Sequence, residues 1–599
     1  MDTRVSEHRL RIQRVQEALA AAGADALLVP SSDPHLSEYL PEHWQGRQWL
    51  SGFTGSMGTL AVTREQAAVF ADSRYWTQAE AELAGTGIAL VKIATGTSPE
   101  HLDWLAREVP RGGTVMVDGQ VLGLAAAQQL RERLQAAGVA LRTDTDLLQQ
   151  AWPGRPALPS APVYEHAAPF APVPRADKLR AVRAAMQERG ASHHLVSTVD
   201  DIAWITNLRG SDVSYNPVFL AHLLVGPAQA TLFVGAGKVD AALAQALAAD
   251  GIVLAPYETA AAALGALPAE ATVLLDPKRV TLGLRQAITA ARVVEATNPS
   301  TLAKSRKTAD EAAHVREAMA EDGAAMCEFY AWFEAALARG EPMTELTVDE
   351  RLSAARARRR GFVGLSFPVI AGFNANGAMP HYRATPASHA RVEGDGLLLI
   401  DSGGQYLGGT TDITRVWPVG TVSAAMKRDY TLVLKGTLNL SRARFPRGTP
   451  SPMLDALARA PLWAENLEFG HGTGHGVGYF LNVHEGPQSI SKAVPTPDMA
   501  MQPGMITSVE PGLYRPGRWG VRIENLVLNV PAGESEFGEF LAFETLTLCP
   551  IDTRCIERSL LRDDEIAWLN AYHATVRERL APRVDGDARA WLLARTEPI

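Results

Sequence analysis

The sequence contains few cysteines, no excess of basic residues and no long apolar run. Its 599 residues include three cysteines, Cys327, Cys549 and Cys555, whose spacing matches no metal-binding or redox motif. Lysine and arginine number 57 against 66 acidic residues, and the net charge of −9 disfavours a nucleic acid or an anionic membrane as partner. No run approaches the roughly 18 apolar residues that a membrane span needs.

The remaining composition is that of an ordinary globular protein. Hydrophobic residues make up 46% and charged residues 21% of the chain. The length suggests about three to four domains. The N-terminus, MDTRVSEHRLRIQRVQEAL, predicts a charged amphipathic helix without an apolar signal core. Together with free thiols, these features predict a cytoplasmic protein.

Short apolar strands alternate with helical patterns up to about residue 155. The predicted strands are 24–30, 58–63, 67–72, 87–93 and 114–119, and the predicted helices are 73–83 and 124–137. Such alternation indicates an α/β domain, which we place at residues 1–155. The proline-rich segment 152–176 follows, and because proline blocks regular ladders we expect it to be a linker.

The next region, residues 177–305, repeats this style. The predicted strands are HHLVST, HLLVG, ATLFVG, GIVLAPY and TVLLDP. An internal echo links the two regions, because WLSGFTGS (49–56) matches WITNLRGS (204–211) in pattern. Two α/β units could share eight positions by coincidence, but two domains of one fold is the simpler interpretation.

The character of the chain changes in the last region, residues 306–599. Two capping boxes, Thr308 with Glu311 and Thr347 with Glu350, predict helices that end at Arg339 and Arg360. Residues 362–415 and 501–549 are rich in predicted strands and glycine turns, and 556–582 returns to helix. Helices followed by strands, without alternation, predict an α+β domain built around an antiparallel sheet.

One stretch of this region, GLLLIDSGGQYLGGTTDITR (396–415), brings two carboxylates to the ends of strands. The apolar run Leu397 to Ile400 predicts a buried strand that delivers Asp401. A second extended run, Thr410 to Trp417, delivers Asp412. Because a lone buried carboxylate is costly, a shared metal is the plainest way to satisfy both.

Other ionisable residues flank predicted strands or turns of the same region. They are His381 in NANGAMPHY, His471, His475 and His484 in FGHGTGHGVGYFLNVHEGP, Glu510 in MITSVEPGLY, and Arg522 and Glu524 in WGVRIENLVLNV. Singly, each has an ordinary structural explanation, such as a capped turn or an exposed ion pair. Together, four carboxylates and one histidine on apolar strands predict an oxygen-rich site for divalent ions.

So many anions favour two ions that share bridging carboxylates over a single ion. A water between two such ions becomes hydroxide near neutral pH, which suits hydrolysis. The remaining histidines suit a different role, because imidazoles can bind a carbonyl oxygen or shuttle protons.

The motifs DSGGQYLGGTTDITR, HGTGHGVG, SVEPGLY and VRIEN, in this order, resemble the pita-bread metallopeptidases. Within that group the chain resembles the long, three-domain Xaa-Pro aminopeptidase (aminopeptidase P) family. SGFTGSMGTLAV and DDIAWITNLRGSDVSYNPVF resemble its first and second domains. The resemblance implies two related α/β domains followed by a pita-bread α+β catalytic domain.

The resemblance also implies roles for individual residues. The implied metal ligands are Asp401, Asp412, His475, Glu510 and Glu524, with Asp412 and Glu524 bridging two divalent ions. The implied substrate-side residues are His381, His471 and His484, with Tyr514 and Arg522 close to the metals. Manganese is the usual metal in the family, and zinc or cobalt can substitute. The family further implies a homodimer.

The implied activity is hydrolysis of the bond between an N-terminal residue and a penultimate proline, by a metal-bridging hydroxide. The alternatives are a prolidase, which cleaves Xaa-Pro dipeptides, and a creatinase-like enzyme without metal, which would lack the carboxylate set. A non-catalytic binding protein of the same fold would have lost one or more ligands, and none is lost here.

Overall fold

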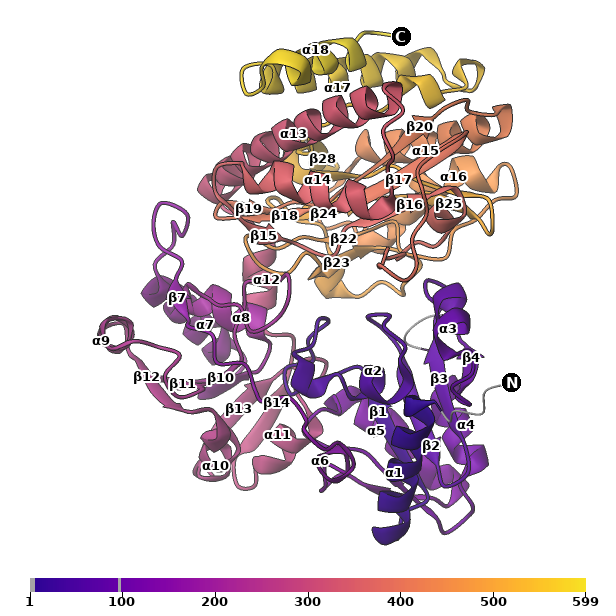
Figure 1. Cartoon of the computed structure of the whole chain (residues 1–599). Helices are drawn as coiled ribbons and strands as arrows, with labels where there is room; N and C mark the ends of the chain where they lie inside the picture. The colour runs from indigo at the N-terminus through magenta and orange to yellow at the C-terminus, as the bar shows by residue number, and fades with distance from the viewer. Residues whose placement is uncertain (1–5, 95–97) are drawn as a thin grey trace. The chain divides into compact units, whose positions relative to one another are not determined.

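The computed structural model describes residues 6–94 and 98–599, which form two compact units (Figure 1). The N-terminal unit comprises Met1–His166 and Val173–Ser300, and the C-terminal unit comprises Ala167–Pro172 and Thr301–Ile599. Among the described residues, no helix is long and apolar enough to cross a membrane.

The N-terminal unit contains two six-stranded sheets. The first has the order β4-β3-β2-β1-β5-β6, formed by Ala89–Lys92, Ala67–Ala71, Thr59–Thr63, Ala26–Pro30, Thr114–Met116 and Ala140–Arg142. Helices α1 (Glu7–Ala21), α3 (Trp76–Leu83), α4 (Glu100–Glu108) and α5 (Leu124–Ala137) accompany it. The predicted α/β character of this region is confirmed.

The second sheet repeats the topology of the first. Its order is β12-β11-β10-β8-β13-β14, formed by Ile252–Pro256, Ala230–Val234, Ala221–Val225, His193–Val196, Thr272–Leu275 and Arg292–Glu295. In each sheet, counted in the order given, the third strand is antiparallel to the second and to the fourth strand. All other neighbouring strands are parallel. This identity of order and direction supports the predicted relationship between the two domains.

The pattern that the two segments share is explained by their backbone conformation. Helix α2 (Gly46–Ser51) ends at Gly52, and helix α8 (Val199–Thr206) ends at Asn207. Both capping residues have left-handed backbones, with φ of 76° and 53°, and glycine and asparagine tolerate this conformation best. The two echoing segments therefore turn the chain in the same way.

The proline-rich segment differs in part from the predicted linker. Strand β7 (Tyr164–Glu165) pairs antiparallel with β9 (Leu208–Arg209), so a short ladder forms where none was expected. The following residues 167–172 belong to the C-terminal unit. They are fixed there by the Tyr479 hydroxyl, which donates to the Phe170 carbonyl at 2.8 Å.

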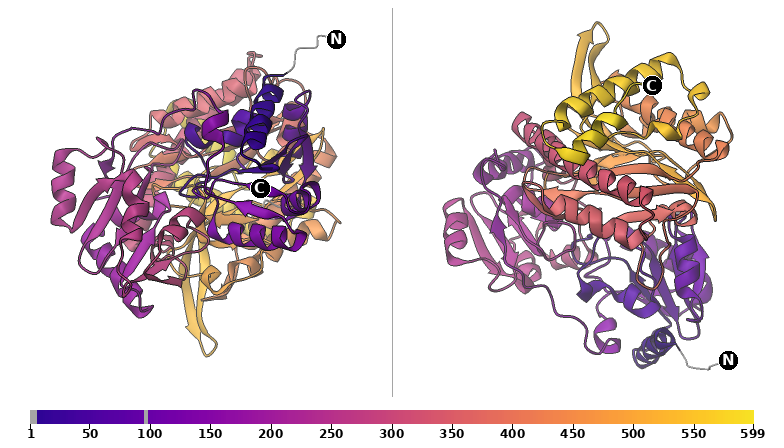
Figure 2. Two further views of the ribbon diagram at one scale, coloured as in Figure 1. Left: turned by 90° about the horizontal axis from the view of Figure 1, so that it is seen from below. Right: turned by 45° about the horizontal axis from the view of Figure 1, so that its top comes forward.

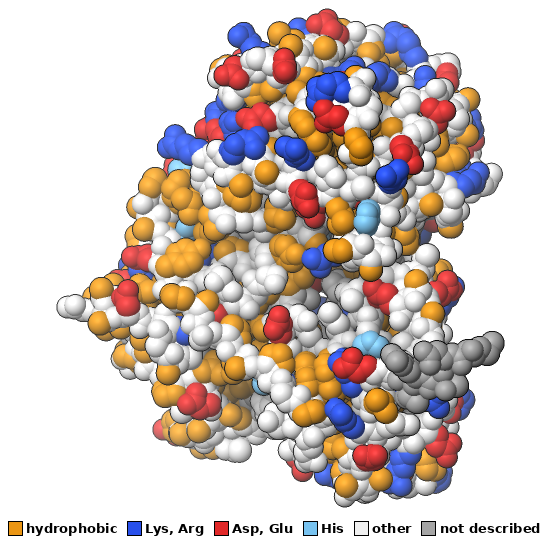
Figure 3. Space-filling model, in the orientation of Figure 1, with side chains coloured by type: hydrophobic (Ala, Val, Ile, Leu, Met, Phe, Trp, Pro, Cys, Tyr) orange, Lys and Arg blue, Asp and Glu red, His pale blue; other side chains and the backbone are white. Residues whose placement is uncertain are grey.

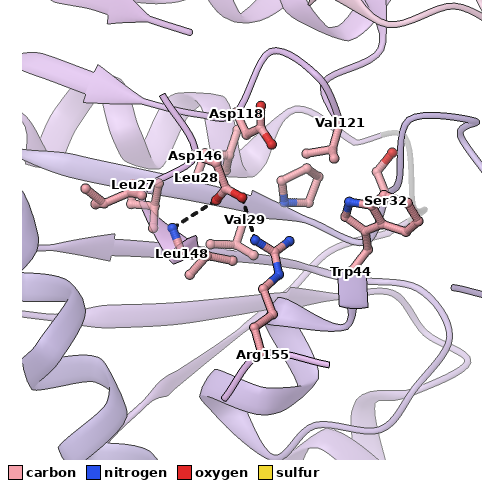
Figure 4. A pocket seen from close by; sticks show the side chains of 12 residues that line it. Leu27, Leu28, Val29, Ser32, Trp44, Asp118, Val121, Asp146, Leu148 and Arg155 are labelled. Atoms are coloured by element: carbon pink, nitrogen blue, oxygen red, sulfur yellow. Dashed lines mark hydrogen bonds and ion pairs between the residues drawn. The ribbon is translucent and has the colours of Figure 1, made fainter. Parts of the chain in front are cut away.

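A small pocket lies at the carboxyl ends of the parallel strands β1 and β5 (Figure 4). Its polar lining consists mainly of Asp118, Asp146 and Arg155. Asp146 accepts from the Leu148 amide at 3.0 Å and pairs with Arg155 at 2.5 Å, as the dashed lines in Figure 4 mark. This pocket belongs to the N-terminal unit and contains none of the predicted site residues.

The C-terminal unit combines long helices with antiparallel sheets. Its main helices are α13 (Ala309–Ala338), α14 (Glu345–Ala357), α15 (Ala424–Ser441), α17 (Asp563–Leu580) and α18 (Gly586–Arg595). One sheet has the order β16-β17-β20 (Ile370–Phe373, Gly396–Ser402, Ile413–Val419). Another has the order β21-β28-β27-β24-β22-β23 (Arg444–Pro446, Gly538–Thr545, Asn525–Ser535, Ile506–Val509, Gly474–Gly476, Glu485–Ile490).

One of the two predicted helix starts is correct. Thr308 and Glu311 form the reciprocal capping box of α13. The second helix begins earlier than predicted, because Thr344 caps α14 by accepting from the Thr347 amide at 3.2 Å, and Thr347 lies within the first turn. This helix also ends at Ala357 instead of Arg360.

Helices α13, α17 and α18 cover one side of the C-terminal unit (Figures 1 and 2). Tyr330 of α13 stacks on Trp417 of β20 at 4.1 Å between ring centroids and on Trp591 of α18 at 5.6 Å. The hairpin of β27 and β28 extends beyond the rest of this unit in both views of Figure 2. The helical layer thus buries the outer face of the sheet that contains β17.

Basic and acidic side chains alternate over the face shown in Figure 3, which has no large patch of one sign. This distribution agrees with the modest net charge of −9.

Candidate metal centre

Strands β17 and β20 bring the first two carboxylates together. Asp401 is the sixth residue of β17 and pairs with Thr414 of β20. Asp412 directly precedes β20. The apolar run Leu397 to Ile400 is fully within the core, so both carboxylates lie at the ends of strands of a buried sheet, as the sequence predicted.

The other three predicted ligands come from the six-stranded sheet. His475 lies in β22, and Glu510 follows β24. Glu524 lies between β26 (Trp519–Arg522) and β27. The Glu510 amide donates to the Thr473 carbonyl at 2.7 Å, and the Glu524 amide donates to the Thr414 carbonyl at 3.1 Å. The second bond joins the two sheets next to the carboxylates.

The ligand atoms of three of these residues converge. Atoms of Asp412, His475 and Glu524 lie within 4.8 Å of one another, a spacing that one metal ion can bridge. His475 Nε2 lies 3.5 Å from Asp412 Oδ2 and 3.3 Å from Glu510 Oε1. His475 Nδ1 is 2.9 Å from the Gly476 carbonyl and therefore carries the proton, so Nε2 is the nitrogen left to face a metal.

Two buried carboxylate oxygens in the cluster have no hydrogen-bond partner among the residues that the structure describes. Asp401 binds Arg522 Nη2 through Oδ2 at 2.6 Å, and Glu524 accepts from the Thr414 hydroxyl through Oε2 at 2.7 Å. The remaining atoms, Asp401 Oδ1 and Glu524 Oε1, are buried without a partner. Since such atoms are costly to bury, they fit a divalent cation, as does a donor set of four carboxylates and one imidazole.

The pKa values of these side chains also favour a cation site. Burial, together with Asp412, raises the pKa of Asp401 to about 6, although Arg522 opposes the rise. Burial raises the pKa of Glu510 to about 7, and burial with the charge of Asp412 raises that of Glu524 well above its ordinary value. Burial lowers the pKa of His475, but Asp412 and Glu510 outweigh it and raise the value to about 9. Without a cation, these groups hold protons that a metal would displace.

Arg522, Tyr514 and His471 form a chain that begins at Asp401. Arg522 Nη1 donates to the Tyr514 hydroxyl at 2.6 Å, and that hydroxyl lies 2.7 Å from His471 Nε2. Burial raises the pKa of Tyr514 to about 12, so the phenol stays neutral and can donate to His471. His471 Nδ1 in turn lies 2.7 Å from the Gly472 carbonyl, which fixes the tautomer with Nδ1 protonated.

The remaining two histidines, His484 and His381, are each linked to a different member of the cluster. The ring centroid of His484 lies 4.4 Å from that of His475, and the two rings are nearly perpendicular. His381 follows Pro380, whose carbonyl accepts from Arg522 Nη2 at 3.3 Å. The structure thus places all ten predicted site residues in the C-terminal unit, linked directly or through neighbours; their individual roles remain predictions.

Sequence reasoning did not single out the residues that hold the His484 loop. Glu485, next to His484, is buried and receives Lys304 Nζ at 3.0 Å and Lys307 Nζ at 2.6 Å. Lys307 also donates to the Val477 carbonyl at 2.7 Å. No spacing marks these residues, because the lysines lie about 180 positions before the glutamate.

A buried arginine holds the His471 loop in the same manner. Arg459 Nη2 donates to the His471 carbonyl at 2.7 Å, and Arg459 Nε pairs with Asp455 at 2.6 Å. Asp455 also accepts from the Thr473 hydroxyl at 2.5 Å. The i, i+4 spacing of Asp455 and Arg459 on α16 (Asp455–Trp463) is a visible signal, but it equally fits an ordinary helical ion pair.

Family models match nearly the whole chain. Metallopeptidase family M24 matches residues 313–530, and the C-terminal region of this peptidase family matches 539–599. The creatinase/prolidase N-terminal domain matches twice, at 11–147 and 154–311. The two N-terminal matches agree with the two sheets of like topology.

Relatives align over the full length of the chain. Aminopeptidase P2 of Arabidopsis thaliana is 38% identical over 96% of this chain and 86% of its own. A probable Xaa-Pro aminopeptidase P of Sordaria macrospora is 36% identical over 98% of this chain and 99% of its own.

A solved structure is similar in fold throughout. The X-prolyl aminopeptidase of Caenorhabditis elegans, described as a cytosolic enzyme with a di-nuclear active site, superposes with a TM-score of 0.93. It is 31% identical, and the match covers 100% of both chains. The chain therefore belongs to metallopeptidase family M24, within its group of Xaa-Pro aminopeptidases, and is a metal-dependent hydrolase.

Proposed function

We propose that this enzyme hydrolyses the peptide bond between an N-terminal residue and a penultimate proline. The observation that carries the proposal is the cluster of four carboxylates and His475, in which two buried oxygens have no hydrogen-bond partner among the described residues. The chain that carries this cluster is related over 96% of its length to an aminopeptidase P. A prolidase is the weaker alternative, because the full-length relatives are named aminopeptidases.

The cluster is suited to two divalent ions. In this proposal Asp412 and Glu524 would be shared by the two ions, Asp401 would be a ligand of one ion, and His475 and Glu510 would be ligands of the other. The description of the worm enzyme as di-nuclear supports a pair. An oxygen-rich donor set suits manganese, with zinc or cobalt as substitutes. Two such ions supply Lewis acidity and lower the pKa of a water molecule.

The residues around the ions orient the reacting groups. Arg522 holds Asp401 Oδ2, so that Oδ1 is directed away from the guanidinium. The Tyr514 hydroxyl donates to His471 Nε2 at 2.7 Å and so fixes the orientation of the ring. We assign His381, His471 and His484 to binding of the scissile peptide and to proton transfer, because imidazole can do both near neutral pH.

The proline of the substrate explains why residues that bind the scissile peptide and transfer protons are needed. The nitrogen of an Xaa-Pro bond is tertiary and carries no hydrogen, so a substrate contact that other aminopeptidases can use is missing. Side chains that grip the carbonyl oxygen and deliver a proton to the leaving nitrogen compensate for that loss.

The remaining assignments follow from the relatives. We propose domains at 1–155, 177–305 and 306–599, a cytoplasmic location and a homodimer; the matched ranges of the family models and the description of the worm enzyme as cytosolic support the first two. Peptides with proline at position two are the proposed substrates.

The test is metal analysis coupled to an assay. Purified protein is stripped with chelator, reconstituted with manganese, zinc or cobalt, and offered Xaa-Pro-Yaa tripeptides and Xaa-Pro dipeptides. We expect release of the first residue from tripeptides, with most activity in manganese. Cleavage of dipeptides alone indicates a prolidase, and activity that survives complete metal removal contradicts the proposal.

A further inference from the structure

The segment that carries His381 is tied to one buried carboxylate outside the metal centre. Glu345 is the first residue of α14, and its side chain is fully buried. Its Oε1 accepts from the Phe373 amide at 2.7 Å, and its Oε2 accepts from the Ala390 amide at 2.7 Å. These two amides belong to the first and last residues of the segment 373–390. The single carboxylate of Glu345 therefore holds both ends of this segment.

Two side chains from within the segment complete the shell of Glu345. The Tyr382 hydroxyl donates to Oε2 at 2.7 Å, and Asn376 Nδ2 lies 3.0 Å from both oxygens. Asn376 also donates to the Tyr382 hydroxyl at 3.0 Å. All four donors are neutral, so converging dipoles and the N-terminus of α14 stabilise the carboxylate of Glu345.

These contacts hold the chain on both sides of His381. Tyr382, the next residue, is bonded to Glu345, and Pro380, the preceding residue, is bonded to Arg522. Arg522 is itself paired with Asp401. The backbone at His381 is therefore fixed between the metal-centre arginine and the carboxylate of Glu345.

We propose that Glu345 is a positioning residue that sets the place of His381 relative to the metal centre. The proposal depends on the proposed function in one respect, namely that His381 contacts the substrate. Glu345 itself touches neither the ions nor the peptide; it acts through the segment 373–390. A displacement of a catalytic group by about 1 Å can cost a hundredfold in rate, so loss of this tie has a measurable effect.

The test is a double-mutant cycle with manganese-loaded enzyme and an Xaa-Pro-Yaa tripeptide. In Glu345→Gln, an amide NH₂ group replaces one carboxylate oxygen and cannot accept hydrogen bonds from the surrounding donors. We expect kcat/KM to fall about tenfold or more in the native background. In the His381→Ala background, Glu345→Gln should change kcat/KM by less than about twofold, because the imidazole through which Glu345 is proposed to act is absent. Equal losses in both backgrounds, or no loss in either, overturn the proposal.

Glu350→Gln is the matched control, since Glu350 lies on the same helix with an exposed side chain. It makes the same change of charge and is expected to leave kcat/KM unchanged. Manganese binding should be equal in both variants; loss of metal from Glu345→Gln alone contradicts a role restricted to His381.

A second readout needs no activity. Arg383 lies exposed within the segment, so cleavage by trypsin after Arg383 reports how firmly 373–390 is held in the metal-free protein. We expect faster cleavage there in Glu345→Gln than in Glu350→Gln, and equal rates contradict the anchoring. If native enzyme is inactive on peptides but this difference is found, the proposed function fails while the anchor stands.

If Glu345→Gln does not fold, Tyr382→Phe replaces it in the cycle. That variant removes one of the four donors and leaves the carboxylate in place. A loss of kcat/KM that disappears in the His381→Ala background supports the proposal, and a loss of equal size in both backgrounds overturns it.

Discussion

At the scale of single residues, the metal centre is defined by what its side chains lack. Asp401 and Glu524 each satisfy one oxygen with a protein donor, and the other oxygen is buried with no partner in the described part of the chain. A protein cannot hold such atoms cheaply unless something positively charged fills the space between them. The unsatisfied atoms are therefore a more direct sign of a cation site than the residue types alone.

Substitution of Glu524 tests this reasoning. Glu524→Gln removes a ligand that would be anionic beside a metal, and it replaces a buried carboxyl whose ionisation is disfavoured by burial and by the charge of Asp412. We expect hydrolysis to fall by about 100-fold or more. We also expect the metal-free variant to be at least as stable as the native chain at pH 8, measured by urea unfolding. The exposed Glu393→Gln should change neither quantity, and a strongly destabilised Glu524→Gln contradicts the account.

The pH dependence of the metal-free protein has a definite sign. Folding raises the pKa of Asp401 to about 6, of Glu510 to about 7 and of His475 to about 9. Each folded group binds its proton more tightly than the unfolded chain does, so the contribution of these three groups to the free energy of unfolding falls as pH rises from about 4 to 9. Manganese should reverse this trend, because it competes with the same protons. Urea unfolding across this range, with and without metal, checks both signs.

At the scale of elements, the site depends on how closely two strands approach. Gly474 in β22 faces Ser508 in β24, and a Cβ on Gly474 would lie 1.9 Å from the Ser508 carbonyl oxygen. Ser508 also accepts from the His475 amide at 2.9 Å and donates to Glu510 at 3.2 Å. The spacing of these strands thus sets the distance between two ligands.

Gly474→Ala should therefore impair metal binding as well as stability. The strands must separate to admit the methyl group, and such overpacking costs about 1–3 kcal/mol. Gly364→Ala in β15 (Phe362–Leu365) is the matched control, because its Cβ meets nothing within 4 Å. Thermal melts and manganese titrations of both variants decide the matter; equal behaviour of the two would be evidence against a constraint set by β22 and β24.

Sequence reasoning succeeded where a local pattern carried the information. The run Leu397 to Ile400 marked β17 and hence Asp401, and the capping box at Thr308 marked α13. It failed at α14, because two threonines three residues apart both fit a cap and only the fold selects Thr344. Glu345 escaped notice because its donors lie 28 to 45 positions away, beyond any local pattern.

At the scale of the whole molecule, the five proposed ligands lie in one of two compact units. The N-terminal unit contributes none of them, although it holds two α/β sheets of the same topology. Stabilisation by metal should therefore be unequal between the two parts of the chain.

Calorimetry tests this expectation. Free manganese at a hundred times its dissociation constant adds about 2.7 kcal/mol to the unit that binds it. We expect a thermal transition assigned to the C-terminal unit to move upward with manganese, while that of the N-terminal unit stays in place. A uniform shift of both transitions would show that the units unfold as one.

We assign Asp401, Asp412, His475, Glu510 and Glu524 as ligands of a pair of divalent ions. Anomalous diffraction at the manganese edge, from crystals grown in excess manganese, tests this assignment. We expect two strong peaks among these five side chains. A single peak, or none at this place in well-ordered crystals, would contradict it.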